Sequence, residues 1–172
     1  RIEPAKYDVS SWAVTGAGGR ERHVINSMNL DPDVHEKHVT RLDQKYKTIE
    51  KNEVRYECYL TDEAEIMVSA FGITSRICKS VVNRLRKCGW KIGLFRPITL
   101  WPFPYDEVRK LTEHAKRFLV VELNTGQMLE DIRLGAEGRA SVDFFGKVGG
   151  LLPTEGEIEA KLENLAQGAI KA

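Results

Sequence analysis

Three apolar runs of strand length constrain the fold of this chain more than any other feature. They are Ile66–Ala70 (IMVSA), Ile92–Phe95 (IGLF) and Phe118–Leu123 (FLVVEL), and none alternates cleanly between apolar and polar residues. Strands covered on both faces have this pattern, which favours a parallel sheet between two helical layers. A fourth run, Val142–Phe145 (VDFF), alternates more clearly and suits a strand at the edge of the sheet.

Helical segments separate these runs. Apolar residues recur at helical spacing in Ile77–Cys88 and Val108–Ala115, a shorter segment follows Thr125, and a last one spans Ile158–Ala169. Gly89 suits the C-terminal end of the first helix. The alternation of strands and helices predicts a three-layer α/β/α sandwich with right-handed crossovers. In such a sheet, ligands and partners meet the loops at the carboxyl ends of the strands.

The segment before the sheet has a different pattern. Residues 1–30 lack periodicity, and we expect a linker there. Asp31 and Pro32 mark the start of a helix, which we expect over residues 31–53 as a connection to an α/β domain at residues 54–172. The apolar stripe of this helix is narrow and suits contact with a partner or another domain. The stripe consists of Val39, Leu42, Tyr46 and Ile49.

Composition excludes several classes of protein. The 172 residues include 26 basic and 25 acidic side chains spread along the chain, so a nucleic-acid partner is not expected. No apolar run is long enough for a membrane span. Three scattered cysteines do not form a disulfide framework, which indicates a reducing cytoplasm. The chain begins at Arg1 and not at Met, so we expect a piece of a longer polypeptide.

A glycine-rich loop, Val14–His23 (VTGAGGRERH), looks at first like a phosphate-binding loop. The dinucleotide motif GxGxxG needs a third glycine where this chain has Glu21, and the loop precedes the sheet that it would have to serve. We therefore expect a flexible bend and not a nucleotide site. The charged residues of this bend, Arg20, Glu21 and Arg22, are expected to be solvated.

Metal ligation and catalysis have little support in the sequence. His35 and His38 are three positions apart, whereas the zinc-protease motif needs four, so a solvated helix start is favoured over a zinc site. The sequence has no CxxC pair, which argues against an iron–sulfur cluster held by this chain. No nucleophile–base pair stands out. We therefore predict no catalytic residue, no cofactor ligand and no metal ligand.

Two of the loops that follow strands contain candidate binding residues. In Asn124–Met128 (NTGQM), Thr125 is expected to cap the next helix, whose free N–H groups could then face an anion or a partner's carboxylate. Alternatively, Glu122 and Asn124 satisfy the backbone groups of a tight turn, and the sequence leaves both open.

The second loop, Arg96–Pro104 (RPITLWPFP), combines prolines with aromatic residues such as Trp101. Proline fixes the backbone, and exposed aromatic residues with arginine are common anchors of protein interfaces. The loop therefore predicts a rigid interface, with the wall of a ligand pocket as the alternative.

Longer segments resemble the C-terminal half of the α subunit of 2-oxoacid:ferredoxin oxidoreductases, most closely the 2-ketoisovalerate type. The segments that carry the resemblance are GLFRPITLWPFP, VVELNTGQMLEDIRL, VDFFGKVGG, INSMNLDPDVHEKHVTRLDQKYKTIEKNEVRYE and TDEAEIMVSAFGITSRI. The 2-oxoglutarate enzymes share RPITLWPFP and GQM, so they stay an alternative, as does a free-standing α/β module that binds a nucleotide or CoA.

The resemblance implies an enzyme that decarboxylates a branched-chain 2-oxoacid on thiamine diphosphate, reduces ferredoxin through iron–sulfur clusters and forms acyl-CoA. It implies a fold like the C-terminal domain of transketolase, with one antiparallel edge strand, which the run at Val142–Phe145 suits. A pyrimidine-binding domain would precede the linker. The β subunit would bind the diphosphate and Mg²⁺, and γ and δ subunits would hold the clusters. The implied assembly is a cytoplasmic hetero-oligomer in which this chain holds no cofactor.

The resemblance also implies that the matched motif positions make contacts between domains or subunits. These positions are Arg96, Pro97, Glu122, Asn124, Gly126 and Gln127. Together with Trp101 and Thr125 they are the candidate interface residues of the chain.

Overall fold

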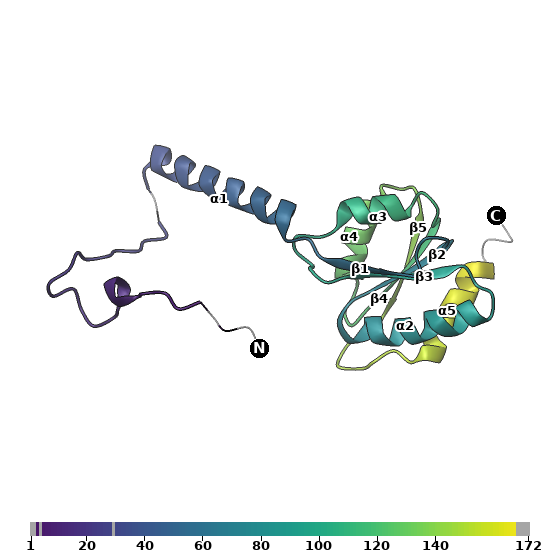
Figure 1. Cartoon of the computed structure of the whole chain (residues 1–172). Helices are drawn as coiled ribbons and strands as arrows, with labels where there is room; N and C mark the ends of the chain where they lie inside the picture. Colours follow the sequence, from purple (N-terminus) through teal and green to yellow (C-terminus); the bar gives the residue numbers. More distant parts are fainter. Residues whose placement is uncertain (1–2, 4, 29, 168–172) are drawn as a thin grey trace. The chain divides into compact units, whose positions relative to one another are not determined.

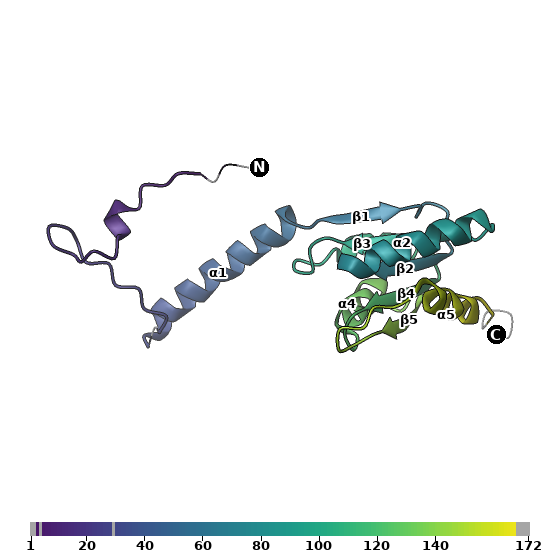
Figure 2. The same cartoon turned by 90° about the horizontal axis from the view of Figure 1, so that it is seen from below.

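The computed structural model describes residue 3 and residues 5–28 and 30–167. The chain forms two compact units, which divide between Gln44 and Lys45. We refer to the part from Lys45 onward as the α/β unit (Figure 1; Figure 2). Within the described residues, no helix is both long enough and apolar enough to cross a lipid bilayer.

The first unit contains a short 3-10 turn, η1 (Ser10–Trp12), just before the glycine-rich loop. The rings of Trp12 and His23 stack with their centroids 4.2 Å apart. Arg20 differs from the expectation that it is solvated, because it is half-buried and its Nη2 donates to the Ala13 carbonyl at 2.5 Å. Internal contacts of this kind give the bend a local structure.

Helix α1 (Pro32–Asn52) begins where the sequence predicts. The carboxylate of Asp31 accepts hydrogen bonds from the N–H groups of Asp33 at 2.9 Å and Val34 at 3.1 Å, so Asp31 caps the helix. All residues of α1 are described, and none of them is fully buried. Its narrow apolar stripe therefore does not enter a core in this chain.

Five strands of the described chain form one sheet in the order β1-β3-β2-β4-β5. They are β1 (Tyr56–Tyr59), β2 (Ile66–Ala70), β3 (Ile92–Pro97), β4 (Arg117–Glu122) and β5 (Ser141–Gly146). Strands β2, β3, β4 and β5 are parallel, and β1 is antiparallel to β3. The predicted sandwich with a mostly parallel sheet is confirmed.

The antiparallel edge strand is β1, not the run at Val142–Phe145 that was expected to supply it. That run lies in β5, which is an edge strand as predicted but is parallel to β4. Strand β1 escapes sequence analysis because it has only four residues, with Glu57 among them, and alternates between exposed and half-buried positions.

Four helices cover the two faces of the sheet. Helices α3 (Tyr105–Leu111) and α4 (Gln127–Ala136) lie on one face, and α2 (Gly72–Lys87) and α5 (Glu155–Gln167) lie on the other (Figure 1). Gly89 follows the end of α2 with a φ of 87°, in the left-handed region that favours glycine, which confirms the predicted helix end.

The sheet divides the hydrophobic core into two clusters. Successive residues of a strand point to opposite faces, so each strand contributes to both clusters. The cluster under α3 and α4 includes Met67, Phe95, Phe118, Val120 and Ile132. The cluster under α2 and α5 includes Val68, Leu94, Leu119, Val121 and Ile158. Burial on both faces is the reason that these strands are apolar runs without alternation.

Gly93 in β3 lies against the turn that precedes β2. A Cβ atom at this position would lie 2.7 Å from the Leu60 carbonyl oxygen and 3.0 Å from the Thr61 Cα. Because both contacts are with backbone, we expect Gly93→Ala to lower the free energy of unfolding by about 2 kcal/mol. Urea denaturation measures the change.

Gly156 in α5 is the matched control, because a Cβ there meets no atom within 4 Å. We expect Gly156→Ala to raise the free energy of unfolding by about 0.5 kcal/mol, since it restricts the unfolded chain. Equal denaturation midpoints for the two variants would contradict the proposed backbone clash.

Candidate functional site

The carboxyl ends of the parallel strands bring the candidate residues to one edge of the sheet. Arg96 and Pro97 end β3, and Glu122 ends β4. The loops that follow β2, β3, β4 and β5 meet at this edge because these strands are parallel neighbours. We call this end of the sheet the carboxyl edge. It is where α/β proteins commonly bind their ligands.

The carboxylate of Glu122 occupies the N-terminus of α4. Glu122 is 1% exposed, and its Oε2 accepts hydrogen bonds from the Met128 N–H and the Asn124 side-chain amide, both at 2.9 Å. Its Oε1 accepts from the Leu129 N–H at 3.0 Å. The positive end of the helix dipole stabilises a carboxylate in this position. The chain therefore supplies its own anion where an external one could have docked.

Asn124, and not Thr125, completes the cap of α4. The Asn124 Oδ1 accepts hydrogen bonds from the N–H groups of Gly126 at 2.7 Å and Gln127 at 3.2 Å. Gly126 has a left-handed backbone with φ 108°, and the turn places Asn124 over the first N–H groups of the helix. The expected Thr125 cap is therefore wrong. The geometry agrees with the alternative in which Glu122 and Asn124 accept hydrogen bonds from the backbone N–H groups of a tight turn.

The loop after β3 has a buried base and an exposed tip. The residues of its base are Pro97, Pro102, Phe103 and Pro104, and those of its tip are Ile98, Leu100 and Trp101. The Arg55 carbonyl accepts hydrogen bonds from the N–H groups of Ile98 at 2.9 Å and Thr99 at 3.1 Å. Anchored in this way, the loop holds apolar side chains in solvent.

Arg96 connects the two strands at the β1 side of the sheet. Its Nη1 donates to the Glu57 Oε2 at 3.0 Å, directly across the β1–β3 pairing. Lys79 from α2 donates to the other oxygen of Glu57 at 3.3 Å. These two cations hold the pKa of Glu57 below its ordinary value, with Lys79 the larger cause. The buried Nε of Arg96 has no hydrogen-bond partner in the described part of the chain.

A groove of about 690 Å³ lies beside the base of the same loop. We call it the aromatic groove, after the four aromatic residues among those that line it. Its lining residues are Glu50, Lys51, Val54, Tyr56, Trp101, Pro102, Phe103, Pro104, Tyr105, Asp106, Glu107 and Lys110.

Glu107 is the polar centre of the aromatic groove. It accepts a hydrogen bond from the Tyr56 hydroxyl at 2.8 Å, which raises the pKa of Tyr56 to about 12. Burial, with the Glu107 charge as the next cause, raises the pKa of the Cys58 thiol to about 11. Both raised values lie well above neutral pH, so both groups keep their protons there.

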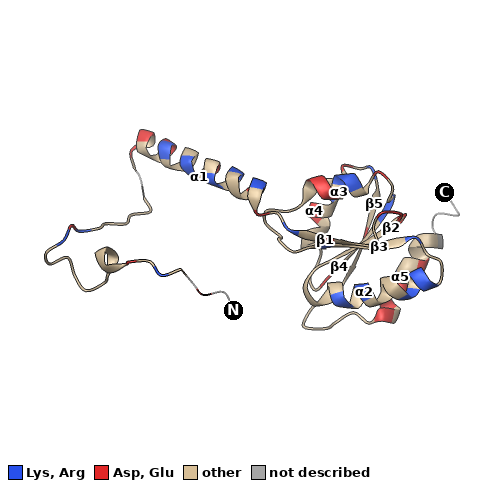
Figure 3. Ribbon diagram, in the orientation of Figure 1, with Lys and Arg blue, Asp and Glu red and all other residues tan. Residues whose placement is uncertain are grey.

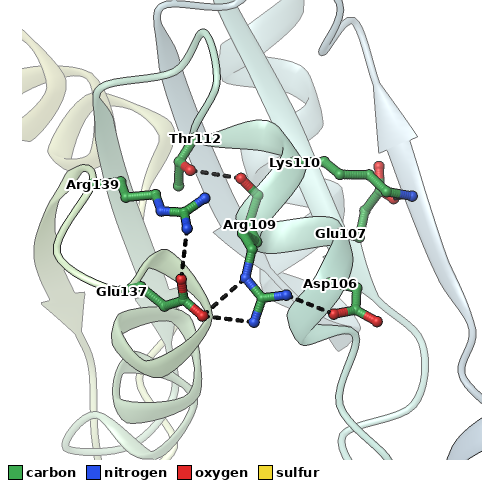
Figure 4. Close-up of polar contacts among 7 residues, drawn as sticks. All are labelled: Asp106, Glu107, Arg109, Lys110, Thr112, Glu137 and Arg139. Atoms are coloured by element: carbon green, nitrogen blue, oxygen red, sulfur yellow. Dashed lines mark hydrogen bonds and ion pairs between the residues drawn. The ribbon is translucent and has the colours of Figure 1, made fainter.

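Polar contacts between α3 and α4 fix the two candidate loops relative to each other. Arg109 of α3 donates to Glu137 at the end of α4, at 2.9 and 2.6 Å, and to Asp106 at 3.0 Å (Figure 4). The Tyr105 hydroxyl donates to Asp131 of α4 at 2.6 Å. Because α3 follows one loop and α4 follows the other, these contacts couple the loops.

Sequence analysis misses the groove, since Tyr56 and Glu107 are 51 positions apart and share no motif. Over residues 5–28 and 30–167, no three His, Cys, Asp or Glu side chains form a group that could hold a metal ion. The candidate residues that the structure does bring together are the ends of β3 and β4 with the loops that follow them.

The Glu122 carboxylate is expected to stabilise the fold. In Glu122→Gln, an amide NH₂ group would face N–H donors that now bind carboxylate oxygens. We expect this variant to lose about 2–3 kcal/mol of unfolding free energy, measured by urea denaturation. The matched control is Glu130→Gln on the exposed side of α4, which should change stability by less than about 0.5 kcal/mol. Equal losses in both variants would refute the capping role.

Variants at Asn124 and Thr125 test which of the two residues caps α4. Removing the side-chain oxygen in Asn124→Ala should cost about 1 kcal/mol, because two N–H groups at the start of α4 lose their acceptor. Thr125→Ala removes no acceptor from these groups and should leave the denaturation midpoint unchanged. The opposite ranking of the two variants would restore Thr125 as the cap.

Known proteins share both the sequence and the fold of this chain. The chain is 43% identical over 157 residues to ketoisovalerate oxidoreductase subunit VorB of Methanothermobacter thermautotrophicus, a match that covers 91% of this chain and 44% of that protein. It is 35% identical over 159 residues to 2-oxoglutarate synthase subunit KorA of Methanothermobacter marburgensis, covering 92% of this chain and 42% of that protein. The chain thus spans less than half the length of these curated relatives.

The fold matches a solved structure, that of 2-oxoglutarate:ferredoxin oxidoreductase from Magnetococcus marinus with 2-oxoglutarate, coenzyme A and succinyl-CoA bound. The TM-score is 0.72 at 23% identity, over 88% of this chain and 28% of that chain. The family model described as pyruvate:ferredoxin oxidoreductase core domain II matches residues 64–158. Because the matched segment is more than half of this chain, the chain belongs to the pyruvate:ferredoxin oxidoreductase core domain II family.

Proposed function

We propose that this chain is part of the α subunit of a thiamine diphosphate-dependent 2-oxoacid:ferredoxin oxidoreductase that acts on branched-chain substrates such as 2-ketoisovalerate. The complete enzyme would form acyl-CoA and CO₂ and reduce ferredoxin. The observation that carries the proposal is the 43% identity to the ketoisovalerate oxidoreductase subunit, against 35% to the 2-oxoglutarate synthase subunit over a similar length.

Within that enzyme, the proposed role of this chain is assembly. The N–H groups at the start of α4 bind Glu122 and Asn124, and Tyr56 and Cys58 are protonated at neutral pH. These contacts support a domain that positions its neighbours and carries no complete active site. Thiamine diphosphate, Mg²⁺ and the iron–sulfur clusters would be held by other parts of the enzyme, and CoA would be a cosubstrate.

The proposed partners follow from this role. They are a pyrimidine-binding domain of the same subunit, the β subunit and the γ and δ iron–sulfur subunits, with ferredoxin bound by the complete enzyme in the cytoplasm. Residues 1–30 would be the linker from the pyrimidine-binding domain, and residues 31–53 would connect it to the α/β domain at residues 54–172. The candidate interface residues at the carboxyl edge would make contacts within this assembly.

The proposed substrate is tested by the activity of the complete enzyme that contains this chain. Reduction of ferredoxin or a viologen dye is measured with CoA and either 2-ketoisovalerate, 2-oxoglutarate or pyruvate. We expect kcat/KM for 2-ketoisovalerate to exceed that for the other two by at least about tenfold, as expected when a substrate pocket fits one side chain. A preference for 2-oxoglutarate would assign the chain to the other branch of the family.

The alternative of a free-standing CoA-binding or nucleotide-binding module is tested by a thermal shift of this chain alone. A ligand that binds the folded state raises the melting temperature by mass action. We expect millimolar CoA or ATP to leave the Tm unchanged. A rise that increases with ligand concentration would favour the free-standing module.

A further inference from the structure

Strand β5 leaves one side of the sheet open. It is the last strand in the order β1-β3-β2-β4-β5, and no described strand pairs with its outer side. Each of its six residues is at least partly exposed, whereas five of the six residues of β4 are buried. Phe144 and Phe145 pack against the two core clusters and are still only half-buried. The outer side of β5 therefore faces solvent in this chain.

The hydrogen bonds to β4 show which backbone groups of β5 point outward. The N–H groups of Ser141 and Lys147 donate to backbone carbonyls at the two ends of β4, at 3.0 and 3.1 Å. Backbone groups alternate in direction along a strand, so the odd-numbered residues of β5 bond to β4 and the even-numbered ones point away. The outward groups belong to Val142, Phe144 and Gly146. Over the described part of the chain, the N–H groups of these three residues have no acceptor.

Strand β5 also lacks the features that keep an edge strand from pairing. Native proteins make such strands short, charged or bulged, or interrupt them with proline. At the other edge, β1 has only four residues, and just beyond it Arg86 donates to the Leu60 carbonyl at 2.6 Å. Strand β5 has six residues without proline, its register with β4 contains no bulge, and Asp143 is its single charged residue. An edge of this kind is a template for another strand.

A second copy of this chain offers a matching edge. When a twofold axis perpendicular to the sheet relates two copies, their β5 strands run antiparallel and present the same outward groups to each other. Even-numbered residues then lie opposite even-numbered ones. The symmetric registers centred in β5 place residue 143, 144 or 145 opposite its own counterpart, and the side chains distinguish among them.

Charge favours the register centred on Phe145. Centring on Asp143 would place two carboxylates directly opposite each other, which is destabilising. Centring on Phe144 would place Asp143 opposite a phenylalanine ring. Centring on Phe145 places Asp143 opposite Lys147 of the second copy, and the twofold axis repeats this pair. Opposite charges in directly opposed positions stabilise a pair of strands.

The surroundings of these charges fit the same register. The Asp143 carboxylate is 4.0 Å from the Lys161 ammonium of α5. The Lys147 ammonium is 2.6 Å from the Glu157 carboxylate of the same helix, so both side chains lie on the face of the sheet that α5 covers. Figure 3 shows both signs of charge on α5. Across the two copies, the four groups would alternate in sign.

We propose that this chain associates with a second copy of itself through β5, so that one continuous sheet crosses the twofold axis. The two β5 strands pair antiparallel, with Phe145 opposite its own counterpart. On the face under α3 and α4, this register places Val148, which is 55% exposed, opposite Val142 of the second copy. The inference goes beyond the proposed function and does not depend on which 2-oxoacid is the substrate.

Cysteine variants of the complete enzyme that contains this chain test the register. Phe145→Cys should form a disulfide with its own counterpart, because the Cα atoms of a directly opposed, non-hydrogen-bonded pair lie about 4.5 Å apart, within disulfide range. Phe144→Cys is the matched control, since the register places Phe144 opposite Gly146. After oxidation with diamide, electrophoresis without reductant measures the covalent dimer. We expect at least about tenfold more dimer from Phe145→Cys than from Phe144→Cys.

A second variant, Asp143→Cys with Lys147→Cys, leaves the core clusters unchanged. Positions 143 and 147 of one strand lie about 13 Å apart, too far for a disulfide within one copy. A dimer from the double variant, and from neither single variant, supports the proposal. A dimer from Phe144→Cys or from Asp143→Cys alone indicates another register and overturns it, and so does the absence of dimer from the double variant. The 2-ketoisovalerate assay on the unmodified enzyme reports the proposed function separately.

Discussion

The carboxylate of Glu122 is the interaction on which the arrangement of the carboxyl edge depends. Its side chain binds the N–H groups at the start of α4, and its backbone carbonyl binds the N–H of Lys147 after β5. One residue at the end of β4 therefore fixes a helix and two loops. A buried carboxylate is stable there because the helix dipole and three hydrogen-bond donors replace the water that it loses.

The edge built in this way presents apolar side chains from several loops. Its ionisable groups bind one another, and its apolar residues are the ones left in solvent. On α3, Arg109 binds Glu137 and Tyr105 binds Asp131. These contacts connect the helix that follows the β3 loop to the helix that follows the β4 loop.

Sequence analysis predicted the central strands well, because burial on both faces leaves a continuous apolar run in IMVSA, IGLF and FLVVEL. It missed β1, whose four residues are stabilised by pairing with β3 and not by a local pattern. It left open whether Thr125 caps α4 or Glu122 and Asn124 satisfy the turn, since the left-handed backbone at Gly126 cannot be read from residue type alone. The aromatic groove joins distant residues, so no local pattern could reveal it.

The division of the core by the sheet also affects how the sequence can change. The cluster under α3 and α4 contains Phe95, Phe103 and Phe118, whereas the buried residues of the cluster under α2 and α5 are aliphatic apart from Cys78. Side chains on opposite faces of a strand do not touch, so a change of volume on one face cannot be compensated on the other. Among homologues, covarying core positions should therefore fall into two sets, one for each face of the sheet. Substitutions in one set should not require compensating substitutions in the other.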